Sequence, residues 1–598
     1  MIFLVKIFNK KFIYLLIIFL AAFLRLYKVT SFPPSLYWEE VALGYDAYSI
    51  LKTGKDHHGN PFPIVAFESF GDWKPSLYFY VLVPFIQIFG LTQLAVRLPS
   101  VISGISIVVG IGLLVKVLLQ NNKKIKAEQA KNLQLVAMAV AAISPWAIQF
   151  SRAGWEVNFA TCLITWGMIL VVKFIQENKF KYLIASFFLL IPAMYAYHSA
   201  RMIAPLLIIG GFATWLYTQL SKKKFSVSNV SAIFKKNFLS LLICFILGLV
   251  LTAPIFSSLN SPEFKHRFAE TSIFTNIDII DESNLRKAKE NNSIVSRIFY
   301  HRYLMFGKEI FKNFASHFDL NYLFISGDLN PRHSVQYFGQ LYHLEIVFLL
   351  LGFIYLVKNW NKFYALLTFW LVIGILPASM TRAVPHALRT LPTMPVFIIL
   401  ICLGIFYAWQ LIKNCWQRTF GNKRCKNFTL IFTLIVAVLY LAELTGFWCY
   451  YQRTYSKVAA GEWQYGYKEM LASVNNLSEK EPDLPVYIDR QLGRPAMYYW
   501  FYNQTDPKLV QISEAIAEKD MSEFLEYDNV IFYTLFSDIN RMPAVVAVSE
   551  ENVTKLAKPE LFKEYQGYQL EVVETITAPH NDDIIWQVGI LKRKTIKD

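Results

Sequence analysis

Three glutamates have the clearest potential for acid–base chemistry in this chain. Glu39 and Glu40 are adjacent in SLYWEEVALGYDAYSILKTGKD, residues 35–56, which follows the first strongly apolar segment. Glu156 lies in SRAGWEVN, a short turn between two further apolar segments. An ionised carboxylate close to a membrane is costly unless it is paired or functional, so all three are candidate proton acceptors. The alternative for Glu156 is that it neutralises Arg152, one helical turn earlier.

The second group of candidates consists of cations that flank apolar segments. A lysine precedes proline in GDWKPSLYFY, and arginines and histidines occur in YAYHSARMIAP, SGDLNPRHS and TRAVPHALRTLP. Such side chains can bind phosphate, to which the planar arginine fork is geometrically suited. Contact with lipid headgroups by snorkelling side chains is the alternative. The members of this group are Lys74, Arg201, Arg332, His333, Arg382, His386 and Arg389.

Motifs for other chemistries are weak or missing from the sequence. SGDLNPRHS resembles a calcium loop only superficially, because too few oxygen ligands follow at the required spacing. His57 and His58 could bind a metal, but we expect a pair of solvated loop histidines. The chain has no Walker loop, dinucleotide fingerprint or Ser/His/Asp order, and its six cysteines lack paired spacing. We therefore predict no metal site and no required cofactor, with a divalent metal as an open alternative.

The elements that must position these residues are membrane-spanning helices. With 55% hydrophobic, 16% aromatic and 17% charged residues, the chain is too apolar for a soluble protein of 598 residues. Repeated apolar segments about 17 to 25 residues long are typical of spanning helices. We expect about eleven such helices, over residues 11–27, 97–119, 134–150, 157–176, 182–198, 202–219, 238–257, 341–357, 363–379, 391–411 and 428–447.

Lysine and arginine clusters between these segments predict the orientation of the chain. If the clusters are cytoplasmic, the spans alternate without conflict and the C-terminus lies outside. The clusters also account for the net charge of +16 without nucleic-acid binding. Residues 74–90 must then not cross; the segment is short and contains Pro84, so we expect a juxtamembrane or re-entrant helix. The predicted outer loops are residues 28–96, 151–156, 199–201, 258–340 and 380–390.

A second domain is predicted after residue 450, where the composition changes. PVYID, NVIFYT and AVVAVS are typical of strands, and PAMYYWFYN and SEAIAEKDMSEFLEY are typical of helices. About 140 residues is a normal size for one α/β core. We therefore expect a polytopic α-helical membrane domain over residues 1–450, with outer loops at 28–96 and 258–340, and an accessory extracytoplasmic α/β domain over 451–598.

Five stretches of the membrane region, taken in their order and spacing, resemble one family. They are WEEVALGYDAYSILKTGKDHHGNPFP, FGDWKPSLYFYVLVPFIQIFGLTQLAVRLPS, ISPWAIQFSRAGWEVNFAT, FISGDLNPRHSVQYFGQLY and MTRAVPHALRTLP. WQYGYKE, residues 463–469, is also of a kind seen after the last span in this family. The sequence resembles the multi-spanning glycosyltransferases of the GT-C superfamily, in the bacterial branch of family 39 (GT39) related to protein O-mannosyltransferases and the lipid A aminoarabinose transferase.

The resemblance implies transfer of a single sugar from a polyprenyl-phosphate donor to an acceptor hydroxyl at the outer membrane face. It matches Glu39–Glu40 to an Asp–Glu pair whose Asp is the base, and Glu156 to an acid of the second outer loop. Lys74 matches a lysine implicated in donor phosphate binding. Because Glu39 is one methylene longer than Asp, the resemblance does not decide between Glu39 and Glu40 as the base. In the family, arginines of later outer loops assist donor binding. The candidates here, chosen by their position in the predicted loops, are Arg201, Arg382 and Arg389.

The family also implies partners and a location. We expect a polyprenyl-phosphate sugar donor, membrane lipids, and a lipid, polysaccharide or protein acceptor, with no nucleic acid. The expected location is the cytoplasmic (inner) membrane, with many passes and an extracytoplasmic C-terminal domain. Direct transfer of a hexosyl or pentosyl group would invert the anomeric carbon. The alternatives are a transporter or flippase of polyprenyl-linked glycans, for which no internal repeat is seen, and an inactive membrane scaffold.

Overall fold

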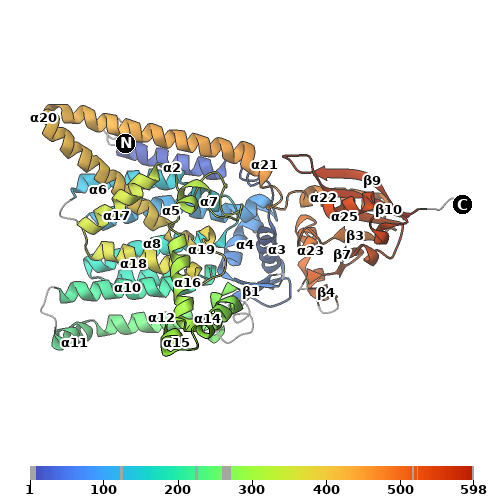
Figure 1. The fold of residues 1–598 in the computed structure, drawn as a ribbon, viewed down its shortest axis with the longest axis horizontal. Helices are drawn as coiled ribbons and strands as arrows, with labels where there is room; N and C mark the ends of the chain where they lie inside the picture. The colour runs from blue at the N-terminus through green and yellow to red at the C-terminus, as the bar shows by residue number, and fades with distance from the viewer. Residues whose placement is uncertain are drawn as a thin grey trace. The chain divides into compact units, whose positions relative to one another are not determined.

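The chain forms two compact units that do not follow one another in sequence. The computed structural model describes residues 9–69, 71–120, 125–221, 226–258, 271–514, 517–520 and 523–594, with the backbone alone over 420–427. One unit, here called the helical unit, combines the residues up to Tyr27 with Ser100–Cys449 (Figure 1). The other, the mixed unit, combines Lys28–Pro99 with the chain from Tyr450. Contacts thus join most of the predicted outer loop 28–96 to the C-terminal residues.

The helical unit is made of helices that differ widely in length. Several are interrupted or preceded by proline, which removes a backbone donor and restricts the residue before it. The main helices are α2 (Lys10–Leu26), α5 (Gln93–Leu119), α6 (Ala127–Ile143), α7 (Pro145–Ser151), α8 (Glu156–Glu177), α9 (Phe180–Ala196), α10 (Ala200–Leu220), α11 (Val227–Lys236), α12 (Phe238–Ser258), α14 (Ile277–Lys289), α15 (Ile294–Phe299), α16 (Arg302–Ser316), α17 (Glu345–Lys358), α18 (Lys362–Ser379), α19 (Ala387–Thr390) and α20 (Met394–Tyr450).

The predicted multi-spanning helical architecture is confirmed, although the predicted number of spans is not. Within the described ranges, seven helices are long and apolar enough to cross a membrane: α5, α8, α10, α12, α18, and the segments Ala387–Thr419 and Phe428–Val458. Most of the last two segments belongs to α20, which turns back on itself (Figure 1). α6 and α7 add an eighth span if this pair, bent by 58° at Ser144, is counted as one.

Three of the predicted spans correspond to shorter helices. α2 and α9 have 17 residues each and α17 has 14, so the count of eleven is not confirmed. Residues 74–90, which we expected not to cross, contain the 13-residue helix α4 (Leu77–Phe89) with Pro84 inside it. At 1.5 Å per residue this helix is about 20 Å long, short of the roughly 30 Å hydrocarbon core.

Glycines allow α17 and α20 to approach closely within the helical unit. A Cβ on Gly404 would lie 1.7 Å from the carbonyl oxygen of Phe348, and a Cβ on Gly352 would lie 2.1 Å from that of Leu400. Both conflicts involve backbone atoms, which cannot rotate away as a side chain can. Small residues at such crossings are typical of helix packing in membranes.

Alanine at either glycine is therefore expected to destabilise the helical unit. Gly404→Ala and Gly352→Ala must push the two helices apart, at a cost of about 1–3 kcal/mol for overpacking. Thermal unfolding of the detergent-purified protein would measure the loss. Gly307→Ala is the matched control, because Gly307 lies in α16 of the same unit and a Cβ at this residue would meet no atom within 4 Å. A Gly404→Ala midpoint equal to that of the control would contradict close α17–α20 packing.

The mixed unit is built around a six-stranded sheet with strand order β6-β7-β3-β8-β10-β9. The three strands β7, β3 and β8 are parallel, and the others pair antiparallel. β3 and β8 are buried along their whole length, as expected for central strands covered on both faces. The strands are β3 (Val486–Asp489), β6 (Glu526–Tyr527), β7 (Val530–Tyr533), β8 (Ala544–Ser549), β9 (Tyr568–Thr577) and β10 (Ile584–Arg593), and the helices include α22 (Tyr467–Lys480), α23 (Pro495–Tyr502), α24 (Pro507–Ser513) and α25 (Glu550–Ala557).

The C-terminal α/β prediction is confirmed except for one helix. SEAIAEKDMSEFLEY, residues 513–527, was expected to be helical, but its described residues form the short strands β4 (Lys519–Asp520), β5 (Glu523–Phe524) and β6 after α24 ends at Ser513. The Phe524 ring is buried 4.7 Å from that of Trp500, centroid to centroid. β6 is hydrogen-bonded to β7. Packing and sheet pairing here outweigh a local helix propensity.

Helix α3 (Trp38–Thr53) is fixed within the mixed unit by the C-terminal residues. A Cβ on Gly44 would come within 2.6 Å of the Phe501 ring on α23, so the two helices are in close contact. The Tyr498 hydroxyl donates to the Leu36 carbonyl at 3.1 Å, and the Tyr45 hydroxyl donates to the Thr505 carbonyl at 3.0 Å. The WEE sequence thus begins a helix with a rigid support.

Candidate functional site

The acidic pair opens helix α3. Glu39 and Glu40 lie in its first turn, where the positive end of the helix dipole favours negative charge. The Trp38 backbone N–H donates to Gln464 Oε1 at 3.1 Å, so the WQYGYKE motif holds the start of this helix. Successive helical residues differ by about 100° in direction. The two carboxylates accordingly have different surroundings and different partners.

Glu40 is held in a fully buried ion pair with Arg97. The guanidinium donates from Nε to Oε1 at 2.9 Å and from Nη2 to Oε2 at 3.1 Å, and both side chains have 0% exposure. Arg97 also donates to the carbonyls of Val29, Pro33 and Ser35 at 2.7, 2.8 and 2.5 Å. This two-pronged geometry matches the arginine fork. The arrangement is that of a structural clamp on the residues that lead into α3.

Glu39 instead faces Lys74. The Lys74 ammonium lies 2.7 Å from Glu39 Oε2, with side-chain exposures of 7% for the lysine and 31% for the glutamate. Lys74 lies on β2 (Asp72–Pro75), which pairs antiparallel with β1 (Ala66–Ser69) just before α4. Asp72 Oδ2 is 3.8 Å from the same ammonium. A buried cation thus positions a carboxylate that remains partly accessible.

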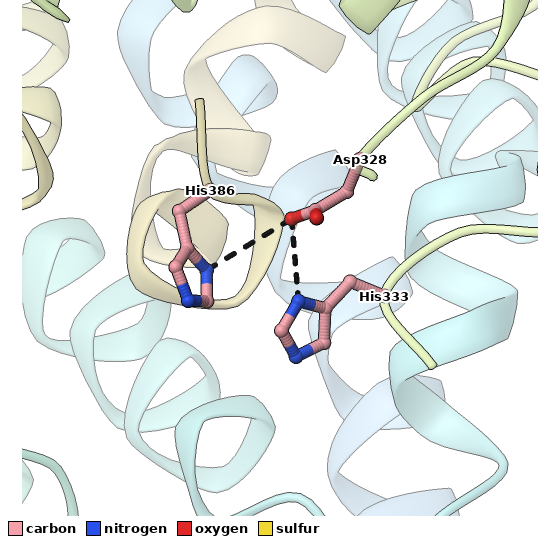
Figure 2. A group of neighbouring side chains, drawn as sticks. All are labelled: Asp328, His333 and His386. Carbon is pink, nitrogen blue, oxygen red and sulfur yellow. Dashed lines mark hydrogen bonds and ion pairs between the residues drawn. The ribbon is translucent and has the colours of Figure 1, made fainter. Parts of the chain in front are cut away.

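The helical unit brings together a second group of predicted residues around an aspartate that was not predicted. Asp328 Oδ2 lies 3.2 Å from His333 Nδ1 and 3.9 Å from His386 Nδ1 (Figure 2). The two imidazole rings are 4.8 Å apart, centroid to centroid. The same carboxylate oxygen accepts a hydrogen bond from the Ala387 backbone N–H at 2.7 Å. The loop that carries His333 and the segment before α19 therefore meet at Asp328.

The local environment shifts the pKa values of Asp328 and His386. Burial disfavours the ionised carboxylate of Asp328, but the hydrogen bond and charge of His333, with His386 and the Ala387 N–H, outweigh it and lower the pKa to about 2. Burial, with the neighbouring His333 and Arg389 charges, holds the pKa of His386 well below its ordinary value. At neutral pH the carboxylate is ionised and the His386 ring is neutral.

His317 positions His386 through its backbone. The His317 ring nitrogen Nε2 accepts from the His386 backbone N–H at 3.3 Å, while Nδ1 lies 2.7 Å from the Asn313 carbonyl oxygen. Because a carbonyl can only accept, Nδ1 carries the proton and Nε2 the lone pair. Burial lowers the pKa of His317 to about 4, which preserves this neutral tautomer.

The candidates near the second predicted outer loop are both buried. Glu156 is 7% exposed at the first position of α8. Arg152 donates to the Leu24 and Tyr27 carbonyls at 2.8 Å each, and its guanidinium lies 5.4 Å from the Trp448 ring centroid. Arg152 therefore ties two segments of the helical unit together. Charge neutralisation of Glu156 by Arg152 stays a prediction.

The four remaining candidate arginines, all in the helical unit, have contacts with protein oxygens. Arg201 donates to the Met194 carbonyl at 3.3 Å, and Arg332 to Asn330 Oδ1 at 3.4 Å. Arg382, which is exposed, donates to Thr275 Oγ1 at 2.9 Å. Arg389 donates to Thr381 Oγ1 at 2.5 Å. Their role in phosphate binding stays a prediction.

The predicted pair of solvated histidines is wrong. His57 is fully buried, with Nδ1 2.6 Å from Asp46 Oδ1, and Ser69 donates to the other oxygen of that carboxylate at 3.3 Å. His58 is only 8% exposed and lies 2.7 Å from Glu514. The His57 ring also lies 6.1 Å from that of Trp500, centroid to centroid, so a loop that looks polar in sequence is packed against the C-terminal residues.

Comparison with known proteins gives structural counterparts only. The chain matches no protein-family profile and no curated protein sequence. It is similar to the solved structures of ArnT from Cupriavidus metallidurans, apo (12% identity) and bound to undecaprenyl phosphate (14% identity), each with TM-score 0.47 and 97% of both chains covered. It is also similar to the oligosaccharyltransferase AglB from Archaeoglobus fulgidus in complex with an inhibitory peptide and a dolichol-phosphate (TM-score 0.48, 11% identity, 83% of this chain and 64% of that chain).

These neighbours are GT-C proteins, the class that the sequence resembles. A likeness of this degree decides no activity, so the function must rest on the residues of the chain itself.

Proposed function

We propose that this chain is a membrane glycosyltransferase. It would move a single sugar from a polyprenyl-phosphate donor to an acceptor hydroxyl at the outer face of the cytoplasmic membrane. The observation that carries the proposal is the Glu39–Lys74 pair, whose charged atoms lie 2.7 Å apart. This pair supplies a proton acceptor and a phosphate-binding cation in one place. A multi-spanning helical protein can also receive a donor that is anchored in the bilayer.

The proposed reaction is a direct displacement. The acceptor oxygen forms a bond to the anomeric carbon as the bond from that carbon to the phosphate oxygen breaks. The bonding electrons leave with polyprenyl phosphate, whose growing negative charge Lys74 stabilises. Glu39 takes the proton of the acceptor hydroxyl. Because an ammonium has three N–H donors, Lys74 can contact Glu39 and a phosphate oxygen together. Attack opposite the leaving group inverts the anomeric carbon.

The other acids and cations have supporting roles in this proposal. By the family resemblance alone, Glu156 is a further candidate acid and the arginines are further candidate cations for phosphate. Glu40 is assigned to the structural clamp with Arg97, because neither of its oxygens is exposed. The arginines concerned are Arg201, Arg382 and Arg389.

Reconstitution of the purified protein separates an enzyme from a transporter. Proteoliposomes would be loaded with a polyprenyl-phosphate-linked radiolabelled sugar and supplied with a cell-envelope lipid fraction as acceptor. A glycosyltransferase converts the donor to free polyprenyl phosphate as label appears in the acceptor. A flippase moves intact labelled donor between leaflets and releases no polyprenyl phosphate, which would overturn the proposal.

Replacement of Lys74 should weaken catalysis more than folding. Lys74→Met keeps the length and apolar stem but removes the ammonium, so we expect transfer to fall by about 10²–10³-fold. Steady-state transfer over a range of donor concentrations would show whether donor binding or turnover is lost. Lys52→Met is the matched control, since Lys52 is an exposed residue in the last turn of α3. Equal losses in both variants would remove Lys74 from the site.

A further inference from the structure

Three potential metal ligands from two separate segments converge in the helical unit. Asp328 and His333 come from the loop before α17, and His386 immediately precedes α19. Figure 2 shows both imidazole rings directing a nitrogen at the same carboxylate oxygen. One ligand atom from each of the three residues lies within 4.8 Å of the other two. Residues far apart in sequence thus form one compact cluster.

The spacing fits a tetrahedral site. Zinc binds nitrogen at about 2.0–2.1 Å and carboxylate oxygen at about 2.0–2.2 Å, which places neighbouring ligand atoms about 3.4 Å apart. The two oxygen–nitrogen distances are 3.2 and 3.9 Å, one on each side of that value. One ligand atom from each residue already lies within 4.8 Å of the other two, so a single ion between them needs only a small contraction of the cluster.

The surroundings orient these ligands as outer-shell groups do in metal sites. Asp328 Oδ1 accepts from the Asn330 N–H at 2.8 Å and Oδ2 from the Ala387 N–H at 2.7 Å. The His333 ring packs at 6.0 Å from Phe150 and 5.6 Å from Trp155, which form an apolar wall. His317 fixes the His386 backbone.

His386 supplies an independent indication. Its Nδ1 atom is buried and has no hydrogen-bond partner among the described residues. A buried polar atom without a partner is unfavourable, and such exceptions in folded proteins call for a cause such as an ion. This nitrogen is the one directed at Asp328.

We propose that Asp328, His333 and His386 bind one divalent transition-metal ion of the zinc class, with water at the fourth position. Two imidazoles and one carboxylate favour zinc over calcium or magnesium, which prefer oxygen ligands alone. The ion would join the loop before α17 to the segment before α19. This proposal does not depend on the proposed transferase activity.

Metal content of the full-length protein tests the site directly. The detergent-purified chain would be stripped with a chelator, incubated with zinc sulfate, desalted and measured by elemental mass spectrometry. We expect about one zinc per chain. Asp328→Asn, His333→Gln and His386→Gln should weaken zinc binding by at least the about 10–100-fold that outer-shell changes cost. Cobalt in place of zinc should give the intense visible absorption of a four-coordinate ion.

His343→Gln is the matched control. His343 Nδ1 lies 3.2 Å from Glu443 in the same unit, and among the described residues this imidazole and carboxylate form no group of three potential ligands. Its zinc content should equal that of the wild type. Size-exclusion chromatography would show that each variant is folded. Wild-type protein that retains no more zinc than Asp328→Asn, or three ligand variants that all retain it, would overturn the proposal.

Discussion

Glu39→Gln is expected to lower sugar transfer by about 10²–10⁴-fold without loss of folded protein, the range that general acid–base catalysis contributes. Glutamine has the same length, and its amide oxygen can still accept a hydrogen bond from Lys74. It cannot accept the proton of the acceptor hydroxyl. Because Glu39 is partly exposed and Asp72 Oδ2 still lies 3.8 Å from the Lys74 ammonium, the exchange should lower the thermal midpoint far less than Glu40→Gln does. Initial rates of transfer from a polyprenyl-phosphate sugar would measure the effect.

A shorter acid at the same position separates geometry from chemistry. Glu39→Asp restores the residue of the family pattern but withdraws the carboxylate by about 1 Å, a misplacement large enough to slow catalysis. We expect transfer between that of the wild type and that of Glu39→Gln. Glu479→Gln, at an exposed position near the end of α22, is the control. Normal transfer by Glu39→Gln would place the base elsewhere, and Glu156→Gln would be the next variant to measure.

Local patterns in the sequence predicted most of the fold. Apolar segments of sufficient length marked α5, α8, α10, α12 and α18, because helix formation in lipid depends on a continuous run of apolar residues. The apolar segments predicted the number of membrane spans less reliably. α2 carries Lys10, Lys11 and Arg25 within 17 residues, and the α6–α7 bend depends on Ser144 before Pro145.

The residues of the candidate site were predicted better than their partners. Glu39 and Lys74 stood out because each is a charge beside an apolar segment, and a short hairpin and one helix bring them together. Arg97 was missed, although an arginine inside the apolar start of α5 was a signal in itself. Asp328 was overlooked within SGDLNPRHS, because one of its two histidine partners, His386, lies in a distant segment just before α19. Contacts between distant segments leave no local pattern to recognise.

The second large effect concerns the acid that we do not assign to catalysis. Glu40→Gln should destabilise the mixed unit by about 3–5 kcal/mol, because it leaves the Arg97 charge buried without its partner. Arg97→Met should cost at least as much, since the carbonyls of Val29, Pro33 and Ser35 also lose their donor. Thermal unfolding at one fixed scan rate would compare the midpoints, with Glu479→Gln as the unaffected reference.

The double variant Glu40→Gln with Arg97→Met tests whether the two side chains stabilise the unit as a pair. Removing both charges eliminates the unpaired ion, so the double variant should be more stable than the sum of the two single losses predicts. Recovery should be incomplete, because the three carbonyls remain without the guanidinium. Per folded molecule, Glu40→Gln should transfer sugar far better than Glu39→Gln. A Glu40→Gln protein that is as stable as the wild type but inactive would reverse the assignment and make Glu40 the base.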